Sequence, residues 1–379
     1  MNFIIEKNEL SSLTTIVYRA ASNKNAIPVL SGLLLEVSLE KGLTMTATDM
    51  EIGIKASIPN IEVIEEGSAL VNAHYFADFI KLLPDTAIEV KYNKDTARLD
   101  IYYGRSSGSI NTYRDYDYPD LPLNKLECNF LLPQQILKEA LKKTVFAAAN
   151  SHFRQVFTGV LFDIVEDQVL KIIASDTHRL AYYTYKLENY EAEPFSFIIP
   201  IRSVNELLRL LDDSEEKINI SIGENNVVFY KDDFILLSRL IEGQYPNYEQ
   251  VIPESFSTSL NIKTDLLEKT LERAKTMPTD DKLKIQNVRL SFKEKEVIVH
   301  SYSEIMGEIE EVLEDIELEG ENDLSIVFNT NYFLDVVKIM DNESDQVDIK
   351  LSGSLGPALI KNPQKENYIY VLVPLRTNN

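Results

Sequence analysis

The chain has 379 residues, which predicts two or three domains, and its 38 Lys and Arg against 60 Asp and Glu give a formal net charge of −22. A charge this negative argues against a simple basic nucleic-acid binder, because such proteins cover phosphates with Lys and Arg. One cysteine (Cys128), no signal sequence and no apolar run of about 18 residues exclude a disulfide framework and a membrane-spanning helix, and they predict a cytoplasmic protein.

Along the chain, short strands and amphipathic helices return in the same order three times. A strand is expected ahead of each first helix, at residues 2–6, 129–132 and 260–262. The apolar spacing of a helical face appears at residues 9–20, 73–83, 133–148, 203–211, 264–276 and 330–340. Ser203 and Glu206 have the spacing of a capping box at the start of one helix. Alternating apolar residues between the helices predict antiparallel strands, about eight in each unit.

The order returns because the sequence repeats itself. The stretch from Gly32 to Asp49 matches the stretch from Gly159 to Asp176 at an offset of 127 residues without a gap. A third copy begins 128 residues later, at Asn287. This period is too long for a solenoid repeat of about 20–50 residues and suits a whole domain. We therefore predict three similar α+β domains, each internally doubled and built from antiparallel sheet with two helices, at residues 1–125, 126–254 and 255–379.

Charge differs between the helices and the rest of the chain. The six helical stretches hold ten Lys or Arg and eight Asp or Glu, a net of +2, so the remaining 28 basic and 52 acidic residues give −24. One interpretation is chance, since helices tolerate Lys and Arg. The other is that the helices share one surface that avoids negative charge, as a wall facing phosphate would.

Motifs for catalysis are weak. The segment Gly104–Gly108 matches the G-x-S-x-G nucleophile elbow around Ser106, but a strand-like stretch follows where a helix is needed, which favours a hairpin turn. The four histidines have no metal-ligand spacing, and no phosphate-binding glycine motif is found. The sequence therefore predicts no catalytic residue, no metal and no cofactor, and a protein that is not an enzyme.

Three local features remain open between structure and function. Residues 175–180 end a strand with polar groups beside apolar ones, which suits a turn closed by Asp176 as well as a binding surface. The apolar C-terminal stretch 368–376 suits a buried last strand, although Pro374 and Leu375 lie beyond the expected ladder and favour the lining of a groove. Residues 304–323 hold ten acidic and no basic residues, typical of a solvated strand face or of a subunit contact.

Together these motifs resemble a known family over the whole chain. The threefold repeat, ASDTHRLA at 174–181, GQYPNYEQVIP at 243–253 and YVLVPLR at 370–376 are similar to the beta subunit of bacterial DNA polymerase III, the replicative sliding clamp. The resemblance implies a head-to-tail homodimeric ring with helices lining a central hole, through which duplex DNA passes without sequence readout. It implies a non-catalytic processivity factor.

The resemblance also implies which cations face DNA and which residues meet across the ring. The DNA-facing candidates are Lys24, Lys138, Lys142, Arg154, Arg202 and Arg209, with Arg19, Lys81, Arg273 and Lys338 behind them. Each is alternatively a solvated side chain with a partner on its own helix. At the dimer contact, Arg105 of one subunit would meet Glu308, Glu310 or Glu311 of the other.

A second implied function is a peptide-docking pocket for the replicative polymerase, the clamp loader and repair proteins, which would insert short apolar motifs. Matching the family motifs gives Phe157, Ser175, Thr177, His178, Arg179, Leu180, Pro246, Val251, Asn329, Tyr332, Pro357, Val371, Val373, Pro374, Leu375 and Arg376. An apolar slot with a few polar groups at its rim suits such a ligand.

The chain departs from the family pattern at a few positions. Gln250 stands where some relatives carry arginine and Pro357 where some carry serine, and the tail 377–379 extends beyond the usual end. Ser107 and Gly108 occupy places where many relatives have bulkier residues, which bears on the strength of the dimer. Two rival functions are a protein-interaction scaffold that does not encircle DNA and a hydrolase that uses Ser106.

Overall fold

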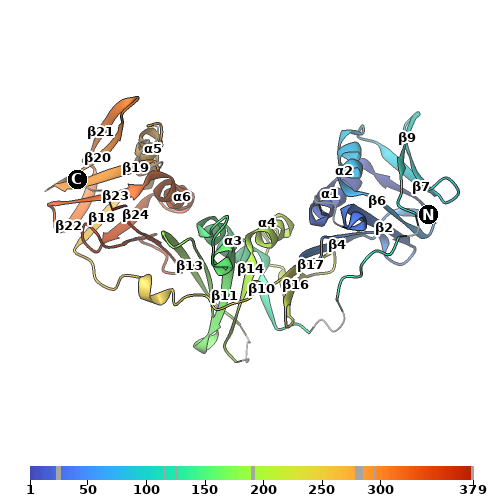
Figure 1. The fold of residues 1–379 in the computed structure, drawn as a ribbon, viewed down its shortest axis with the longest axis horizontal. Helices are drawn as coiled ribbons and strands as arrows, with labels where there is room; N and C mark the ends of the chain where they lie inside the picture. Colours follow the sequence, from blue (N-terminus) through green and yellow to red (C-terminus); the bar gives the residue numbers. More distant parts are fainter. Residues whose placement is uncertain are drawn as a thin grey trace. The chain divides into compact units, whose positions relative to one another are not determined.

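The structure, a computed structural model, describes residues 1–22, 27–114, 116–123, 127–188, 193–277, 285–293 and 295–376. These residues form two compact units, 1–138 with 202–240 and 139–201 with 241–379. Every strand pair in the four sheets is antiparallel, as predicted (Figure 1). None of the described helices is long and apolar enough to cross a bilayer.

The first unit holds two sheets. The five-stranded sheet has the order β5 (Glu62–Glu65), β1 (Asn2–Glu6), β7 (Ala87–Asn93), β8 (Arg98–Tyr103) and β9 (Ser106–Asn111). The eight-stranded sheet has the order β10 (Phe130–Pro133), β15 (Lys217–Ile222), β16 (Asn226–Tyr230), β17 (Phe234–Arg239), β4 (Ile52–Ile58), β3 (Gly42–Thr48), β2 (Gly32–Ser38) and β6 (Gly67–Asn72). Its β17–β4 pair joins the middle third of the chain to the first.

The second unit also holds two sheets. The nine-stranded sheet has the order β14 (Phe195–Pro200), β11 (Gly159–Val165), β12 (Val169–Ser175), β13 (Arg179–Lys186), β26 (Tyr368–Leu372), β25 (Ala358–Lys361), β24 (Gln346–Leu351), β18 (Thr258–Lys263) and β22 (Ile316–Gly320). The four-stranded sheet has the order β21 (Gly307–Leu313), β20 (Glu296–Ser303), β19 (Asn287–Lys293) and β23 (Leu324–Asn329). In the nine-stranded sheet, the β13–β26 pair joins the middle third of the chain to the last.

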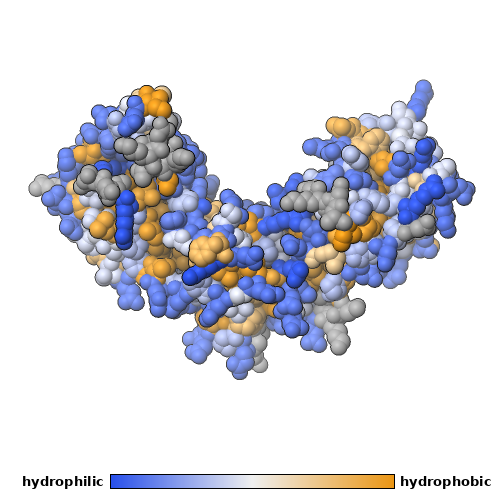
Figure 2. Space-filling model, in the orientation of Figure 1, coloured by the Kyte–Doolittle hydropathy of each residue, from blue (hydrophilic) through white to orange (hydrophobic). Residues whose placement is uncertain are grey.

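All six predicted helices are present. They are α1 (Lys7–Val17), α2 (Ala73–Leu82), α3 (Gln134–Thr144), α4 (Ile201–Leu210), α5 (Thr264–Lys275) and α6 (Thr330–Asp341). Within their units, α1 packs beside α2 and α5 beside α6 (Figure 1). Their apolar faces are buried, with Leu10, Phe76, Leu271 and Phe333 among the fully covered side chains. The opposite faces carry the charged residues, and hydrophilic residues cover most of the face in Figure 2.

Two local predictions have different outcomes. The hairpin at Gly104 is confirmed, because Tyr103 of β8 pairs with Ser106 of β9 and Gly104 has a φ of +60°, which glycine adopts without strain. The prediction of a capping box at Ser203 is wrong. Helix α4 begins two residues earlier, directly after β14, and the Ser203 hydroxyl instead accepts a hydrogen bond from Ser238 at 2.7 Å.

The compact units do not coincide with the sequence repeats. Within the described residues, the middle third places β11–β14 in one sheet and β10 with β15–β17 in another. Counting only the described residues, each third contributes two α-helices and eight or nine strands, as an internally doubled unit would. The boundaries 1–125, 126–254 and 255–379 stay a proposal, and residues 124–126 lie outside the described residues.

Candidate functional site

The turn between β12 and β13 is closed by its own side chains. Asp176 Oδ1 accepts hydrogen bonds from the N–H groups of His178 and Arg179, at 3.0 and 3.1 Å. The Ser175 hydroxyl donates to the Arg179 carbonyl at 2.7 Å and accepts from the Thr177 N–H at 3.1 Å. Thr177 has a φ of +78°. Asp176 therefore closes a turn, and that turn also forms one wall of a cavity.

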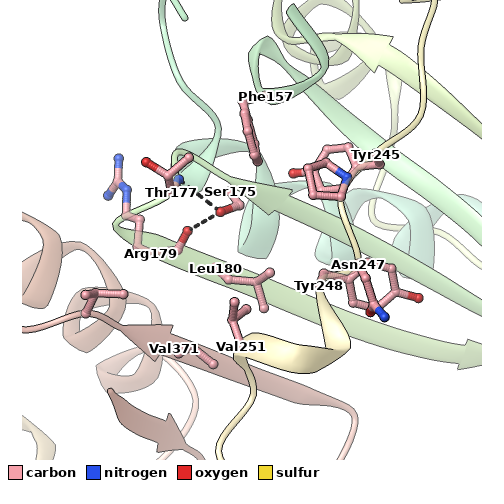
Figure 3. A pocket seen from close by; sticks show the side chains of 12 residues that line it. Phe157, Ser175, Thr177, Arg179, Leu180, Tyr245, Asn247, Tyr248, Val251 and Val371 are labelled. Atoms are coloured by element: carbon pink, nitrogen blue, oxygen red, sulfur yellow. Dashed lines mark hydrogen bonds between the residues drawn. The ribbon is translucent and has the colours of Figure 1, made fainter. Parts of the chain in front are cut away.

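The cavity has a volume of about 170 Å³ and an almost wholly apolar lining. Figure 3 shows side chains from the β12–β13 turn, from the segment 245–251 and from β26 around one space. The lining residues are Phe157, Ser175, Thr177, Arg179, Leu180, Tyr245, Pro246, Asn247, Tyr248, Val251, Val371 and Val373. Its floor is part of the core, because Phe157, Leu180 and Val371 are at most 7% exposed. A floor fixed in the core makes the cavity pre-formed.

Arg179 is the one lining residue with a full charge at neutral pH, and that charge is already paired. Its Nε donates to Asp176 at 3.0 Å, one Nη donates to Asp335 at 2.7 Å, and the other donates to the Phe146 carbonyl at 2.6 Å. The guanidinium lies 4.0 Å from the Tyr332 ring centre and points away from the cavity in Figure 3. Burial lowers the pKa of Arg179, but Tyr370 and the carboxylates of Asp335 and Asp176 together outweigh burial and raise it. The cavity therefore offers a ligand apolar surface rather than a free charge.

The segment 245–251 is attached to strands β11 and β12 of the nine-stranded sheet by two contacts, which we call the wall anchor. The Tyr248 hydroxyl donates to Asp163 of β11 at 2.6 Å, and Lys171 of β12 donates to Glu249 at 2.6 Å. The Lys171 ammonium also lies 5.7 Å from the Tyr248 ring centre and 5.9 Å from that of Tyr182. Burial opposes the charge of Lys171, but Glu249 outweighs it and raises the pKa. The wall anchor holds Tyr248 and the half-exposed Val251 beside the cavity.

The structure brings together nine of the sixteen residues predicted for the pocket. The seven that do not line the cavity are His178, Asn329, Tyr332, Pro357, Pro374, Leu375 and Arg376. Asn329 instead caps α6, accepting from the N–H groups of Asn331 and Tyr332. The Leu375 N–H donates to the Val327 carbonyl at 2.7 Å, so this part of the tail lies against β23.

Three lining residues were absent from the sequence prediction: Tyr245, Asn247 and Tyr248. A signal existed, because the Tyr-Pro pair at 245–246 repeats the pair at 118–119 with the same 127-residue offset. Both tyrosine rings pack on the core cluster beneath the cavity. Burial raises the pKa of Tyr245. Gln250 is adjacent to the lining residue Val251 without itself lining the cavity.

The predicted DNA-facing cations differ in their partners. Lys138 pairs with Asp213 at 3.0 Å, Arg209 with Glu206 on its own helix at 3.1 Å, and Arg202 with Asp49. The remaining two described cations are exposed: Arg154 lies against the Phe153 ring, and Lys142 has no ion pair within the described part of the chain. Lys24 lies outside the described residues. Behind them, Arg19, Arg273 and Lys338 are ion-paired with glutamates, and Lys81 is exposed.

The residues predicted for the dimer contact lie at two sheet edges. Arg105 is exposed in the turn before β9, the last strand of the five-stranded sheet, and β21 is the last strand of the four-stranded sheet. Along β21, Glu308 and Glu310 are exposed, whereas Glu311 accepts hydrogen bonds from Arg273 at 2.5 and 2.6 Å. A Cβ on Gly108 of β9 would lie 2.6 Å from the Phe79 ring, so an aromatic side chain of α2 covers this glycine.

The described residues hold no group of three or more His, Cys, Asp or Glu side chains close enough together to bind a metal ion. Cys128 is exposed and unpaired to any other cysteine, since it is the only one in the sequence.

Comparisons with known proteins cover the whole chain. Family models for the N-terminal, central and C-terminal domains of the DNA polymerase III beta subunit match residues 1–122, 131–247 and 249–376. The chain is 33% identical to the beta sliding clamp of Halalkalibacterium halodurans and 30% identical to that of Bacillus subtilis, over the full length of each. Its fold resembles the crystal structures of the Bacillus subtilis clamp (29% identity) and the Pseudomonas aeruginosa clamp bound to griselimycin (26%), each with a TM-score of 0.90 and full coverage of both chains.

Proposed function

The chain belongs to the DNA polymerase III beta subunit family, the beta sliding clamps, and from this membership we propose how it works. It is a sliding clamp with the three-domain clamp fold. Two chains close into a head-to-tail ring around duplex DNA, and the ring tethers the replicative polymerase and repair proteins. This role is non-catalytic, and its location in the cytoplasm remains a prediction. A scaffold that does not encircle DNA is not favoured, because the likeness to clamps covers the full chain.

The observation that carries the tethering function is the pre-formed apolar cavity. Short peptide motifs bind well where one or two apolar side chains enter a slot that does not need to reorganise. Leu180 and Val371 provide a buried floor, while Val251 and Val373 at the rim are 48% and 39% exposed and are free to contact a ligand. Because the one lining charge is paired, we propose that leucine or phenylalanine anchors, rather than charged residues, provide most of the binding energy.

Fluorescence polarisation with a short peptide bearing Gln, Leu and Phe tests this proposal. The Val251→Glu variant places a carboxylate against the apolar slot, and we expect its peptide affinity to fall at least tenfold. The matched control is Ile64→Glu on β5, a similarly exposed aliphatic side chain at 53% that lies in another sheet. Equal weakening by both variants, or by neither, would remove the cavity as the docking site.

The DNA-facing surface is proposed from the cations around the helices. A clamp that slides along DNA needs phosphate contacts that are shallow and independent of sequence. A ring that encircles DNA needs little equilibrium affinity for it. Lys142 and Arg154, both exposed, are the strongest candidates for direct phosphate contact. The ion pairs of Lys138, Arg202 and Arg209 leave the local field nearly neutral, which suits a wall that tolerates DNA without holding it.

The ring contact is proposed between the two open sheet edges. Edge strands present unpaired N–H and C=O groups, so β9 of one chain and β21 of another have the chemistry to continue one sheet. Arg105 beside β9 and Glu308 and Glu310 on β21 have opposite charge. Phe79 over Gly108 supplies apolar surface at this edge, in place of a bulky residue on the strand itself.

A further inference from the structure

The turn, the neighbouring strand and the covering segment that surround the docking cavity are together called its frame. A second frame of this kind occurs in the first unit, 127 residues earlier in the sequence. Asp49 Oδ1 accepts from the N–H groups of Glu51 and Ile52, both at 3.0 Å, as Asp176 does with the residues that follow it. The Thr48 hydroxyl donates to the Ile52 carbonyl at 2.8 Å and accepts from the Met50 N–H at 3.1 Å. Met50 has a φ of +77°, against +78° for Thr177. The two turns are therefore the same structure.

The neighbouring strand and the covering segment are also repeated. Strand β4 pairs with β17 as β13 pairs with β26, and the Arg239 N–H donates to the Glu51 carbonyl at 2.8 Å. The corresponding bond in the open cavity runs from the Val373 N–H to the His178 carbonyl at 2.9 Å. By this register, Leu237 takes the place of Val371. The Tyr118-Pro119 pair takes the place of Tyr245-Pro246.

The covering segment of the first unit is fastened to the turn. The Thr48 N–H donates to the Tyr118 hydroxyl at 3.0 Å, and that hydroxyl donates to the Gly32 carbonyl at 3.3 Å. Burial raises the pKa of Tyr118 to about 12, and the protonated hydroxyl, which donates one hydrogen bond and accepts another, can make both bonds. The segment 118–123 is thus held against the turn at Asp49. That turn corresponds to the turn at Asp176, which forms a wall of the open cavity.

The two frames differ at the residue that forms the floor of the open cavity. Leu180, on the floor of the open cavity, corresponds to Gly53 in the first unit. Leu121, which corresponds to Tyr248, directs its side chain into the space above Gly53, and its Cδ2 would collide with any Cβ built there. The first frame therefore contains an apolar side chain of its own chain in place of an open slot.

We propose that the first unit contains a second peptide-docking site that Leu121 occupies in cis. Its ligand class is that of the open cavity: a short peptide with an aliphatic or aromatic anchor. Leu121 is such an anchor, which the chain supplies to itself, and each chain consequently presents one open and one closed site. The inference rests on the proposed peptide-docking function of the open cavity.

Two variants that empty or reshape the slot test the proposal. Leu121→Ala removes the internal anchor. Gly53→Leu restores the floor residue of the open cavity and forces Leu121 out, and the backbone of Gly53 does not have the positive φ that would exclude leucine. Isothermal titration calorimetry with the same Gln-, Leu- and Phe-bearing peptide gives the number of peptides per chain. Leu123→Ala, in the same segment, is the matched control.

We expect one peptide per chain for the unaltered protein and for Leu123→Ala, and two for Leu121→Ala and Gly53→Leu, the second within about tenfold of the first in affinity. One peptide per chain in a folded Leu121→Ala or Gly53→Leu protein overturns the second site while the docking function of the open cavity stands. No binding by the unaltered chain instead overturns the docking function itself. Because one variant shortens the Leu121 side chain and the other displaces it, failure of one to fold leaves the other as the test.

Discussion

Arg179 connects parts of the second unit that are distant in sequence. Its guanidinium reaches a carboxylate of its own turn, a carboxylate of α6 and the carbonyl of Phe146. The side chain is 9% exposed, and so is that of Asp176. A buried charge is tolerated only with its partners in place, so the pairing matters more for stability than for attracting a ligand.

We expect Arg179→Met to lower the free energy of unfolding by about 3 kcal/mol, because Asp176 would be left as a buried carboxylate without its counter-ion. Urea denaturation measures this change. Arg376→Met is the control, since Arg376 is exposed and has no ion pair within the described ranges, and its effect should stay within about 0.5 kcal/mol. A loss below about 1 kcal/mol for Arg179→Met would show that the network is not a stability determinant.

At the scale of elements, the docking cavity depends on how the segment 245–251 is held on the sheet. Leu180 and Val371 belong to paired strands of one sheet, so their positions are fixed by the ladder. Tyr248 and Val251 belong to a segment outside the ladder, where the wall anchor is the main attachment that side chains provide. Peptide affinity should therefore respond to residues that never touch the peptide.

Lys171→Met keeps the apolar stem against the two tyrosine rings but removes the bond to Glu249, and we expect it to weaken peptide binding about three- to tenfold. The charge-swapped pair Lys171→Glu with Glu249→Lys should recover most of the loss, which a general loss of stability would not allow. Fluorescence polarisation reports the affinity and thermal melting the stability. Unchanged affinity in Lys171→Met would remove the wall anchor as a positioning device.

The contact between α5 and β21 should make stability depend on pH. The hydrogen bond from Arg273 lowers the pKa of Glu311 below its usual value of 4.5, against a smaller opposing effect of burial. The pair therefore stabilises the fold above about pH 4.5 and loses that contribution as pH falls through the lowered pKa. We expect Glu311→Gln to cost up to about 1 kcal/mol at pH 7 and less at pH 3, where the native carboxylate is partly or wholly protonated. Chemical denaturation at both values measures the difference, and a cost that does not change with pH contradicts the prediction.

At the scale of the whole molecule, the proposed ring depends on charge pairing between sheet edges. We expect the dissociation constant of the dimer to rise about tenfold between 50 and 500 mM salt, since salt screens exposed charges. Analytical ultracentrifugation measures it. Arg105→Glu should weaken the dimer and Glu310→Lys should restore it in the double variant. A dissociation constant that does not respond to ionic strength would remove the charge-pairing explanation.

Sequence periodicity alone located the helices, the hairpin at Gly104 and the threefold repeat, because each follows from local spacing along the chain. The sequence also offered a turn at Asp176 as one of two interpretations, and the hydrogen bonds of that turn reach only two or three residues ahead. The resemblance to a family, and not periodicity, placed Leu180 and Val371 among the pocket residues. These features depend on neighbours in sequence or on motifs that can be read directly.

Tertiary structure decided the rest, because it depends on which distant side chains meet. For Lys138 and Arg202 the sequence offered either a DNA-facing role or a partner on the same helix, and the fold placed Asp213 and Asp49 beside them instead. Tyr248 became a pocket wall only through its contact with Asp163, 85 residues away. The two repeats carry the same turn, yet one slot is open and the other filled, because residues 53 and 121 meet in space although 68 positions separate them in the sequence.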